Sequence, residues 1–82
     1  MFFKKNLVNS HVKKKIKYGV VGVGHLGSFH VEQIQKIKHV HLCGIYDINP
    51  LKSKQAAKKF NTEKYDELDD LLVLSDAVSI VT

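Results

Sequence analysis

Residues 16–27, with the sequence IKYGVVGVGHLG, contain the pattern that decides the fold of this 82-residue chain. The run of residues 16–21 predicts a buried parallel strand, because its second half is apolar on both faces. Gly22, Gly24 and Gly27 follow with the spacing GxGxxG. Such a motif between a strand and a helix is typical of a dinucleotide-binding turn, where the backbone must approach a pyrophosphate closely.

The residues after this motif alternate between helical and strand patterns. Apolar side chains recur at helical spacing over residues 26–37, which predicts a helix that begins at the glycines. Residues 40–46 form a second predicted strand, and Asn49 with Pro50 predicts the N-cap and first turn of a second helix. We interpret the lysine-rich face of that helix as a solvated surface.

The last third of the chain predicts three further elements. They are a weak strand at 62–65, a short leucine-striped helix with Asp66 as its cap, and a buried strand at 77–82. The fold class is therefore α/β, and right-handed crossovers predict a Rossmann-like, doubly wound parallel sheet with the strand order 3-2-1-4. Because this sheet is incomplete, we expect the strand at 77–82 to be an exposed edge.

The positive charge of the chain is concentrated at its beginning. Residues 1–17 hold six lysines and no acid, whereas residues 18–82 hold seven lysines and eight acids. Residues 1–14 also lack the apolar core of a signal peptide, so we expect a disordered basic leader, or sequence upstream of the true start. Residues 15–82 are then expected to be the N-terminal part of a dinucleotide-binding domain, and to be truncated, since they stop on a strand.

Composition argues against several functional classes. No apolar run approaches the roughly 18 residues that a membrane span requires. All 13 basic residues are lysine, whereas nucleic-acid-binding surfaces usually also contain arginine. We therefore expect neither a membrane nor a nucleic acid as a partner. Cys43 is the only cysteine, which is typical of a reducing compartment and predicts a cytoplasmic location.

The histidines do not have the pattern of a metal site. His25 and His30 are five residues apart, whereas two ligands on one helical face would be four apart. His39 and His41 share a strand face, but no third ligand accompanies them in the sequence. We therefore predict no metal.

Each part of the glycine motif has a physical task in nucleotide binding. Gly22 permits the tight turn, Gly24 lets the backbone approach the pyrophosphate, and Gly27 allows the helix to pack closely on the strand. The backbone N–H groups near His25 and Leu26 then face the phosphates at the positive end of the helix. These five residues are therefore predicted to contact the cofactor.

Asp47 strengthens this interpretation and indicates which nucleotide binds. It lies 20 residues after Gly27, where the dinucleotide fingerprint has an acid that accepts hydrogen bonds from the ribose hydroxyls. Its charge would repel the 2′-phosphate of NADP, and the chain has no arginine to receive that phosphate. We therefore expect NAD as the cofactor, with NADP disfavoured. S-adenosylmethionine is also disfavoured, because Val20 and Val21 stand where a methyltransferase loop would be expected to carry an acid.

From Lys17 to Thr82 the chain resembles the N-terminal half of the dinucleotide domain of the Gfo/Idh/MocA oxidoreductases. The similarity is carried by the glycine loop with His30 after it, by Tyr-Asp-Ile-Asn-Pro at residues 46–50, and by Asp-Ala-Val-Ser-Ile-Val-Thr at residues 76–82. It covers about four fifths of this chain, but only a minor part of a typical family member.

The resemblance implies an NAD-dependent dehydrogenase that transfers a hydride between a nicotinamide cofactor and a sugar, polyol or related substrate. It carries over the three glycines and Asp47 as cofactor contacts, and adds Ile48 beside the adenine and Thr82 near the cofactor. In the family a proline and then a histidine follow the position that matches Thr82, and a lysine used in catalysis comes later, in a Glu-Lys-Pro motif. No catalytic residue is therefore assigned, and this chain alone is expected to be inactive.

Two alternative functions remain open. A non-catalytic regulatory module, of the type found on potassium-transport proteins, also pairs a glycine loop with an acid after the second strand. The match from Asn49 onward favours the oxidoreductase over this module. A non-functional fragment would keep the fold without an activity.

Overall fold

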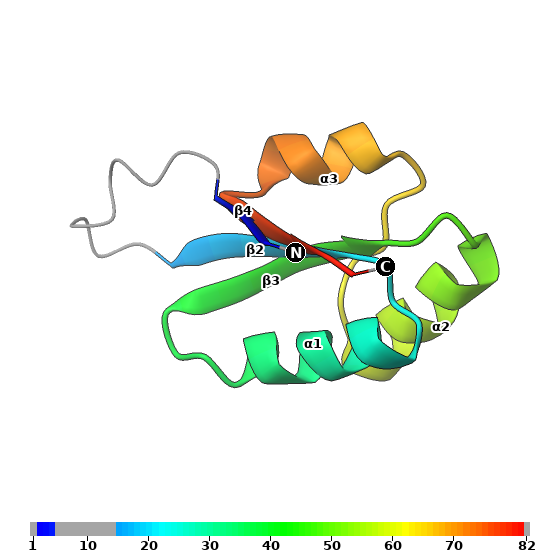
Figure 1. The fold of residues 1–82 in the computed structure, drawn as a ribbon, viewed down its shortest axis with the longest axis horizontal. Helices are drawn as coiled ribbons and strands as arrows, with labels where there is room; N and C mark the ends of the chain where they lie inside the picture. Colours follow the sequence, from blue (N-terminus) through cyan, green and yellow to red (C-terminus); the bar gives the residue numbers. More distant parts are fainter. Residues whose placement is uncertain (1, 5–14, 82) are drawn as a thin grey trace.

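The computed structural model describes residues 2–4 and 15–81, which form one sheet with helices on both faces (Figure 1). The elements are, in chain order, β1 (Phe2–Lys4), β2 (Ile16–Val21), α1 (His25–Gln35), β3 (Val40–Tyr46), α2 (Pro50–Phe60), α3 (Leu68–Leu74) and β4 (Ala77–Ile80). In Figure 1, α1 and α2 cover one face of the sheet and α3 covers the other. This arrangement confirms the predicted α/β, Rossmann-like fold class.

The sheet has the strand order β1-β4-β2-β3. The central strand β2 pairs in parallel with β3 on one side and with β4 on the other, so that Val20 lies between Ile45 and Ser79. These three strands correspond to the first, second and fourth strands of the sequence prediction, and their relative order is as predicted. Because they are parallel, their carboxyl ends meet at one edge of the sheet.

The predicted third strand at 62–65 is reduced to a single parallel bridge between Ile45 and Lys64. Its place beside β3 is the predicted one: the N–H of Ile45 donates to the carbonyl of Glu63 at 2.9 Å, and the N–H of Tyr65 donates to the carbonyl of Ile45 at 3.0 Å. The segment is short and charged, which limits pairing at a sheet edge. The weak strand predicted at 62–65 is therefore wrong in its extent, although its neighbour in the sheet is the predicted one.

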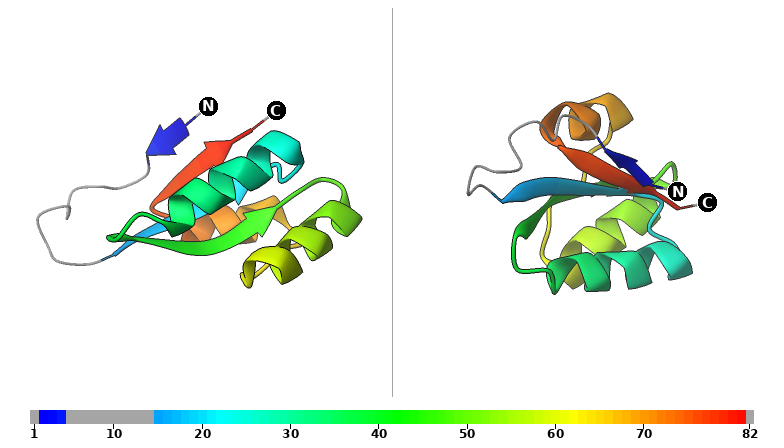
Figure 2. Two further views of the ribbon diagram at one scale, coloured as in Figure 1. Left: turned by 90° about the horizontal axis from the view of Figure 1, so that it is seen from below. Right: turned by 60° about the vertical axis from the view of Figure 1, so that its left-hand side comes forward.

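Phe2–Lys4 correct two further expectations. The sequence predicts that they belong to a disordered leader and that β4 is an exposed edge. Instead they form β1, which pairs antiparallel with β4 and places Phe3 opposite Val78 (Figure 2). An edge strand offers unpaired N–H and C=O groups to any extended segment, and aromatic residues favour strands. Residues 5–14 lie outside the described part of the chain, so disorder there stays a prediction.

The helix caps agree with the sequence at α2 and differ at α3. The side chain of Asn49 accepts a hydrogen bond from the N–H of Leu51 at 3.0 Å, as an N-cap does. For α3, however, the N-cap is Glu67 and not Asp66. The carboxylate of Asp66 instead lies 2.7 Å from the ammonium of Lys64, and this ion pair takes it away from the helix end.

The main core lies between the sheet and the layer of α1 and α2. Val20, Val31 and Ile45 are fully buried there, on β2, α1 and β3 respectively. They fix the position of α1 relative to the carboxyl ends of the strands. Cys43 is half-buried in β3, with its sulfur 3.3 Å from the hydroxyl of Ser75.

Candidate functional site

The loop of residues 22–24 joins β2 to α1 at the carboxyl edge of the sheet. Gly22 has a φ of +90°, which residues with a side chain rarely adopt, and a Cβ there would collide with the carbonyl oxygen of Val81. The N–H of Gly22 donates to the carbonyl of Tyr46 at 2.8 Å. The loop is therefore held between the end of β3 and the residue that follows β4.

Gly27 and Gly24 are needed for different reasons. A Cβ on Gly27, inside α1, would overlap the carbonyl oxygen of Gly22, so the helix can approach the loop only without a side chain there. A Cβ on Gly24 would have one described heavy atom outside its immediate neighbours within 4 Å, the Nζ of Lys52 at 3.8 Å. Gly24 therefore faces open space, which is what the approach of a pyrophosphate requires.

The N-terminus of α1 presents backbone N–H groups at this open space. Gly24 is the N-cap, with no capping hydrogen bond from a side chain and no acid in the first turn. The N–H of Ser28 donates to the carbonyl of Gly24 at 2.9 Å, so the N–H groups of His25 and Leu26 precede the intrahelical ladder. Together with the positive end of the helix dipole, they make this end of α1 suitable for an anion.

Asp47 connects the end of β3 to the glycine loop. One of its carboxylate oxygens accepts a hydrogen bond from the N–H of Val23 at 2.8 Å, and the other accepts one from the N–H of Asn49 at 2.8 Å. The sequence predicts a ribose contact for Asp47, but it does not indicate this link to the loop. Each carboxylate oxygen has a second acceptor position, so Asp47 can hold the loop and accept a ribose hydroxyl at once.

Ile48 and Leu51 give the site an apolar surface beside Asp47. Their side chains are 88% and 61% exposed, although both are large and apolar. Exposed apolar groups next to a polar anchor suit the flat face of a base. Thr82, the remaining predicted contact, lies outside the described residues.

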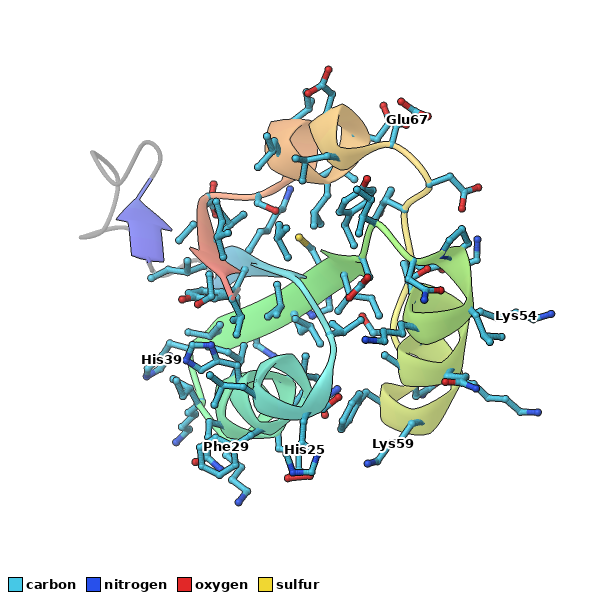
Figure 3. The ribbon with its side chains drawn as sticks, turned by 45° about the vertical axis from the view of Figure 1, so that its right-hand side comes forward. His25, Phe29, His39, Lys54, Lys59 and Glu67 are labelled. Atoms are coloured by element: carbon cyan, nitrogen blue, oxygen red, sulfur yellow. The ribbon has the colours of Figure 1, made fainter. Side chains whose placement is uncertain are left out.

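A groove between α1 and α2 opens beside the glycine loop. It consists of two cavities of about 400 and 310 Å³, and Gly24, His25 and Lys59 line both of them. Lys52 lines the smaller one. In Figure 3, Lys59 extends on the side of α2 that faces His25, whereas Lys54 extends away from α1.

Lys52 and Lys59 line this site, although the sequence pattern alone does not assign them to it. From that pattern the lysines of α2 are predicted to form one solvated face. Their separation of seven residues is about two helical turns, which places both on the same face. That spacing was visible in the sequence, but nothing in it showed that this face borders the glycine loop.

Other chemistry-bearing groups do not extend the site. Tyr65 packs where a Cβ of Gly44 would stand, and burial raises the pKa of its phenol above the ordinary value. Within residues 2–4 and 15–81, no group of three His, Cys, Asp or Glu side chains could hold a metal ion. The described helices are all too short or too polar to cross a membrane.

Comparison with known proteins relates the chain to sugar dehydrogenases. It is 39% identical over 67 residues to the UDP-N-acetylglucosamine 3-dehydrogenase of Acidithiobacillus ferrooxidans, a match that covers 82% of this chain and 21% of that protein. It is 27% identical over 66 residues to the glucose-6-phosphate 3-dehydrogenase of Bacillus subtilis, covering 80% of this chain and 19% of that protein. The chain thus spans about a fifth of the length of these relatives.

Solved structures share the arrangement of strands and helices. The UDP-N-acetylglucosamine 3-dehydrogenase GnnA from Acidithiobacillus ferrooxidans superposes with a TM-score of 0.77 at 38% identity, covering 83% of this chain and 22% of that one. The scyllo-inositol dehydrogenase from Lactobacillus casei with bound NAD(H) and scyllo-inositol superposes with a TM-score of 0.69 at 34% identity, covering 84% and 22%.

A family model confirms the resemblance that the glycine loop and the second-strand acid indicated. It is described as an oxidoreductase family with an NAD-binding Rossmann fold, GFO_IDH_MocA, and it matches residues 16–82. This match includes β2, β3, β4 and all three helices. The chain belongs to the Gfo/Idh/MocA oxidoreductase family.

Proposed function

We propose that this chain forms the part of an NAD site that holds adenosine and pyrophosphate. The parent oxidoreductase would transfer a hydride between the nicotinamide and a sugar, polyol or related substrate. The observation that carries the proposal is the hydrogen bond from the N–H of Val23 to Asp47, which holds a carboxylate beside the open N-terminus of α1. The relatives named as sugar and inositol dehydrogenases support the substrate class.

The residues present fit a dinucleotide. Gly24 leaves the space that a side chain would fill, and the N–H groups of His25 and Leu26 would donate to pyrophosphate oxygens. Gly22 and Gly27 shape the loop around that position.

At the adenosine end, Asp47 would accept the ribose hydroxyls and Ile48 would lie against the adenine. Thr82 is assigned to the cofactor through the family pattern. The bound nicotinamide supplies or receives the hydride, and the residues of this chain bind and orient the other end of the molecule.

We expect the chain to bind NAD more tightly than NADP. The carboxylate of Asp47 repels a 2′-phosphate and loses its ribose hydrogen bond when that phosphate is present. Asp47→Ala should narrow the affinity ratio between the two cofactors, and should also weaken NAD binding, because the link to Val23 is lost. Isothermal titration calorimetry measures both affinities.

Asp70→Ala is the matched control for this experiment. It removes the same charge from an exposed position on α3, on the opposite face of the sheet (Figure 1). The ratio between the NAD and NADP affinities should stay unchanged in Asp70→Ala. A tighter binding of NADP than of NAD by the unmodified chain would contradict the assignment.

We expect the 82-residue chain alone to show no hydride transfer with NAD and a panel of sugars and polyols. Hydride transfer needs the substrate carbon held about 3–3.5 Å from the nicotinamide, with an acid or base on its oxygen. The residues assigned here contact the other half of the cofactor. The absorbance of NADH measures the reaction, and its formation by the chain, lost in Gly24→Val, would show that catalytic groups lie among these residues.

The remaining proposals concern the setting of the molecule. Residues 15–82 form the N-terminal part of the dinucleotide-binding domain, and the preceding basic leader has no assigned ligand. The single cysteine supports a cytoplasmic protein, and the lack of arginine among its basic residues argues against a nucleic-acid partner. The expectation that it does not span a membrane rests on the shortness of its apolar runs. The distribution of a tagged chain between cell fractions tests the location.

A further inference from the structure

We propose that Lys52 contacts the pyrophosphate of the cofactor and adds a side-chain cation to the backbone N–H groups of α1. This inference rests on the proposed function, because it assumes that a dinucleotide occupies the glycine loop. It assigns a binding role to a residue of α2, an element that the glycine motif does not include.

The position of Lys52 is the first argument. Its Nζ lies 3.8 Å from the point at which a side chain of Gly24 would begin. Gly24 is the glycine over which the pyrophosphate of a bound dinucleotide passes. Lys52 also lies in the first turn of α2, whose start is fixed by Pro50 and by the side chain of Asn49. The ammonium is therefore carried to the loop from an anchored helix end.

The electrostatic surroundings of Lys52 are the second argument. A cation in the first turn of a helix is unfavourable, because that end of the helix dipole is positive. The first turn of α2 contains no acid, and neither does that of α1, whose N-cap is Gly24. Lys52 thus starts in the first turn of α2, and its ammonium lies beside the N-cap of α1. An anion bound there would remove this repulsion.

No described acid neutralises Lys52. Within residues 2–4 and 15–81, the salt bridge is that between Lys64 and Asp66. The carboxylate of Asp47 bonds to two backbone N–H groups and forms no ion pair with Lys52 within 4 Å. The ammonium is therefore available to a ligand.

The geometry favours the pyrophosphate over a 2′-phosphate as the group that Lys52 contacts. A 2′-phosphate would replace a hydrogen on a ribose hydroxyl beside Asp47, whereas the ammonium of Lys52 lies beside Gly24. A pyrophosphate contact serves NAD and NADP equally. It should therefore raise the affinity for both cofactors without changing the ratio between them.

Lys52→Met tests the contact, because methionine keeps much of the apolar stem and removes the charge. The full chain, Lys52→Met and Lys54→Met are compared by titration calorimetry with NAD, NADP and adenosine at low and high salt. We expect Lys52→Met to weaken NAD and NADP binding by about 10-fold each, as for a lost hydrogen bond to a charged group. Adenosine, which has no phosphate, should bind unchanged.

Lys54→Met is the matched control, since Lys54 is on the same helix, is exposed and extends away from α1 (Figure 3). Its NAD affinity should equal that of the unmodified chain. The salt dependence of NAD binding should also fall in Lys52→Met and not in Lys54→Met, because salt screens exposed charges. Lys52→Arg should retain most of the affinity.

Several results would overturn the inference. One is an unchanged NAD affinity in Lys52→Met, with circular dichroism showing a folded chain. A second is a loss confined to NADP, which would assign Lys52 to the 2′-phosphate. A third is an equal loss of NAD affinity in Lys54→Met, which would show that the effect comes from the net charge of the chain and not from a contact of Lys52. If the unmodified chain binds neither NAD nor NADP, the proposed function fails, and this inference with it.

Discussion

Gly27→Ala is expected to destabilise the fold by about 3 kcal/mol, which is at the upper end of what overpacking costs. The added Cβ would overlap the carbonyl oxygen of Gly22, and a backbone atom cannot swing away as a side chain can. Gly22 is itself fixed in place, because its N–H donates to the carbonyl of Tyr46. Its φ of +90° also belongs to a tight turn. Alanine is more favourable than glycine inside a helix by only about 1 kcal/mol. The collision outweighs this gain, so the net effect on stability is a loss.

Urea denaturation of the two chains measures this loss through the shift of the unfolding midpoint at constant slope. Gly24→Ala is the control, since it is the same substitution three residues earlier. A Cβ there meets no described atom closer than 3.8 Å, and the φ of −70° suits any residue. Its stability should lie close to that of the unmodified chain. A Gly27→Ala chain as stable as this control would show that α1 does not pack against the loop as described.

The features that could be predicted from the sequence are those that depend on local pattern. The glycine spacing placed the start of α1, and Asn49 with Pro50 placed the start of α2. The order of the three parallel strands followed from right-handed crossovers, which leave few alternatives. Local sequence patterns and the right-handedness of the crossovers are therefore enough to predict the order of the parallel strands and the position of the site at their carboxyl ends.

The features that could not be predicted depend on residues distant in sequence. The pairing of β1 with β4 joins Phe3 to Val78, and nothing near residue 3 indicates this partner. The bond between Val23 and Asp47, and the approach of Lys52 to Gly24, likewise require the sheet to have brought two loops together. The prediction of a third strand was wrong for a related reason. The length of that strand depends on its pairing with β3, which is distant in sequence.

Gly24→Val is expected to abolish dinucleotide binding while leaving the fold intact. A side chain on Gly24 would meet one described atom outside its immediate neighbours within 4 Å, the Nζ of Lys52 at 3.8 Å. The backbone of Gly24 is extended, with φ −70° and ψ −153°, and accepts a β-branched residue. The same space is the one assigned to the pyrophosphate, which a valine side chain would fill. We expect NAD affinity to fall by at least about 100-fold, or about 2.8 kcal/mol.

Calorimetric titration with NAD and adenosine, together with urea denaturation, separates binding from folding in this variant. Adenosine should still bind as it does to the unmodified chain, because Asp47 and Ile48 remain in place, and the unfolding midpoint should stay near that of Gly24→Ala. NAD binding that survives in Gly24→Val would place the pyrophosphate elsewhere. Since the contact proposed for Lys52 depends on the same position, it would then have to be abandoned together with the role of the glycine loop.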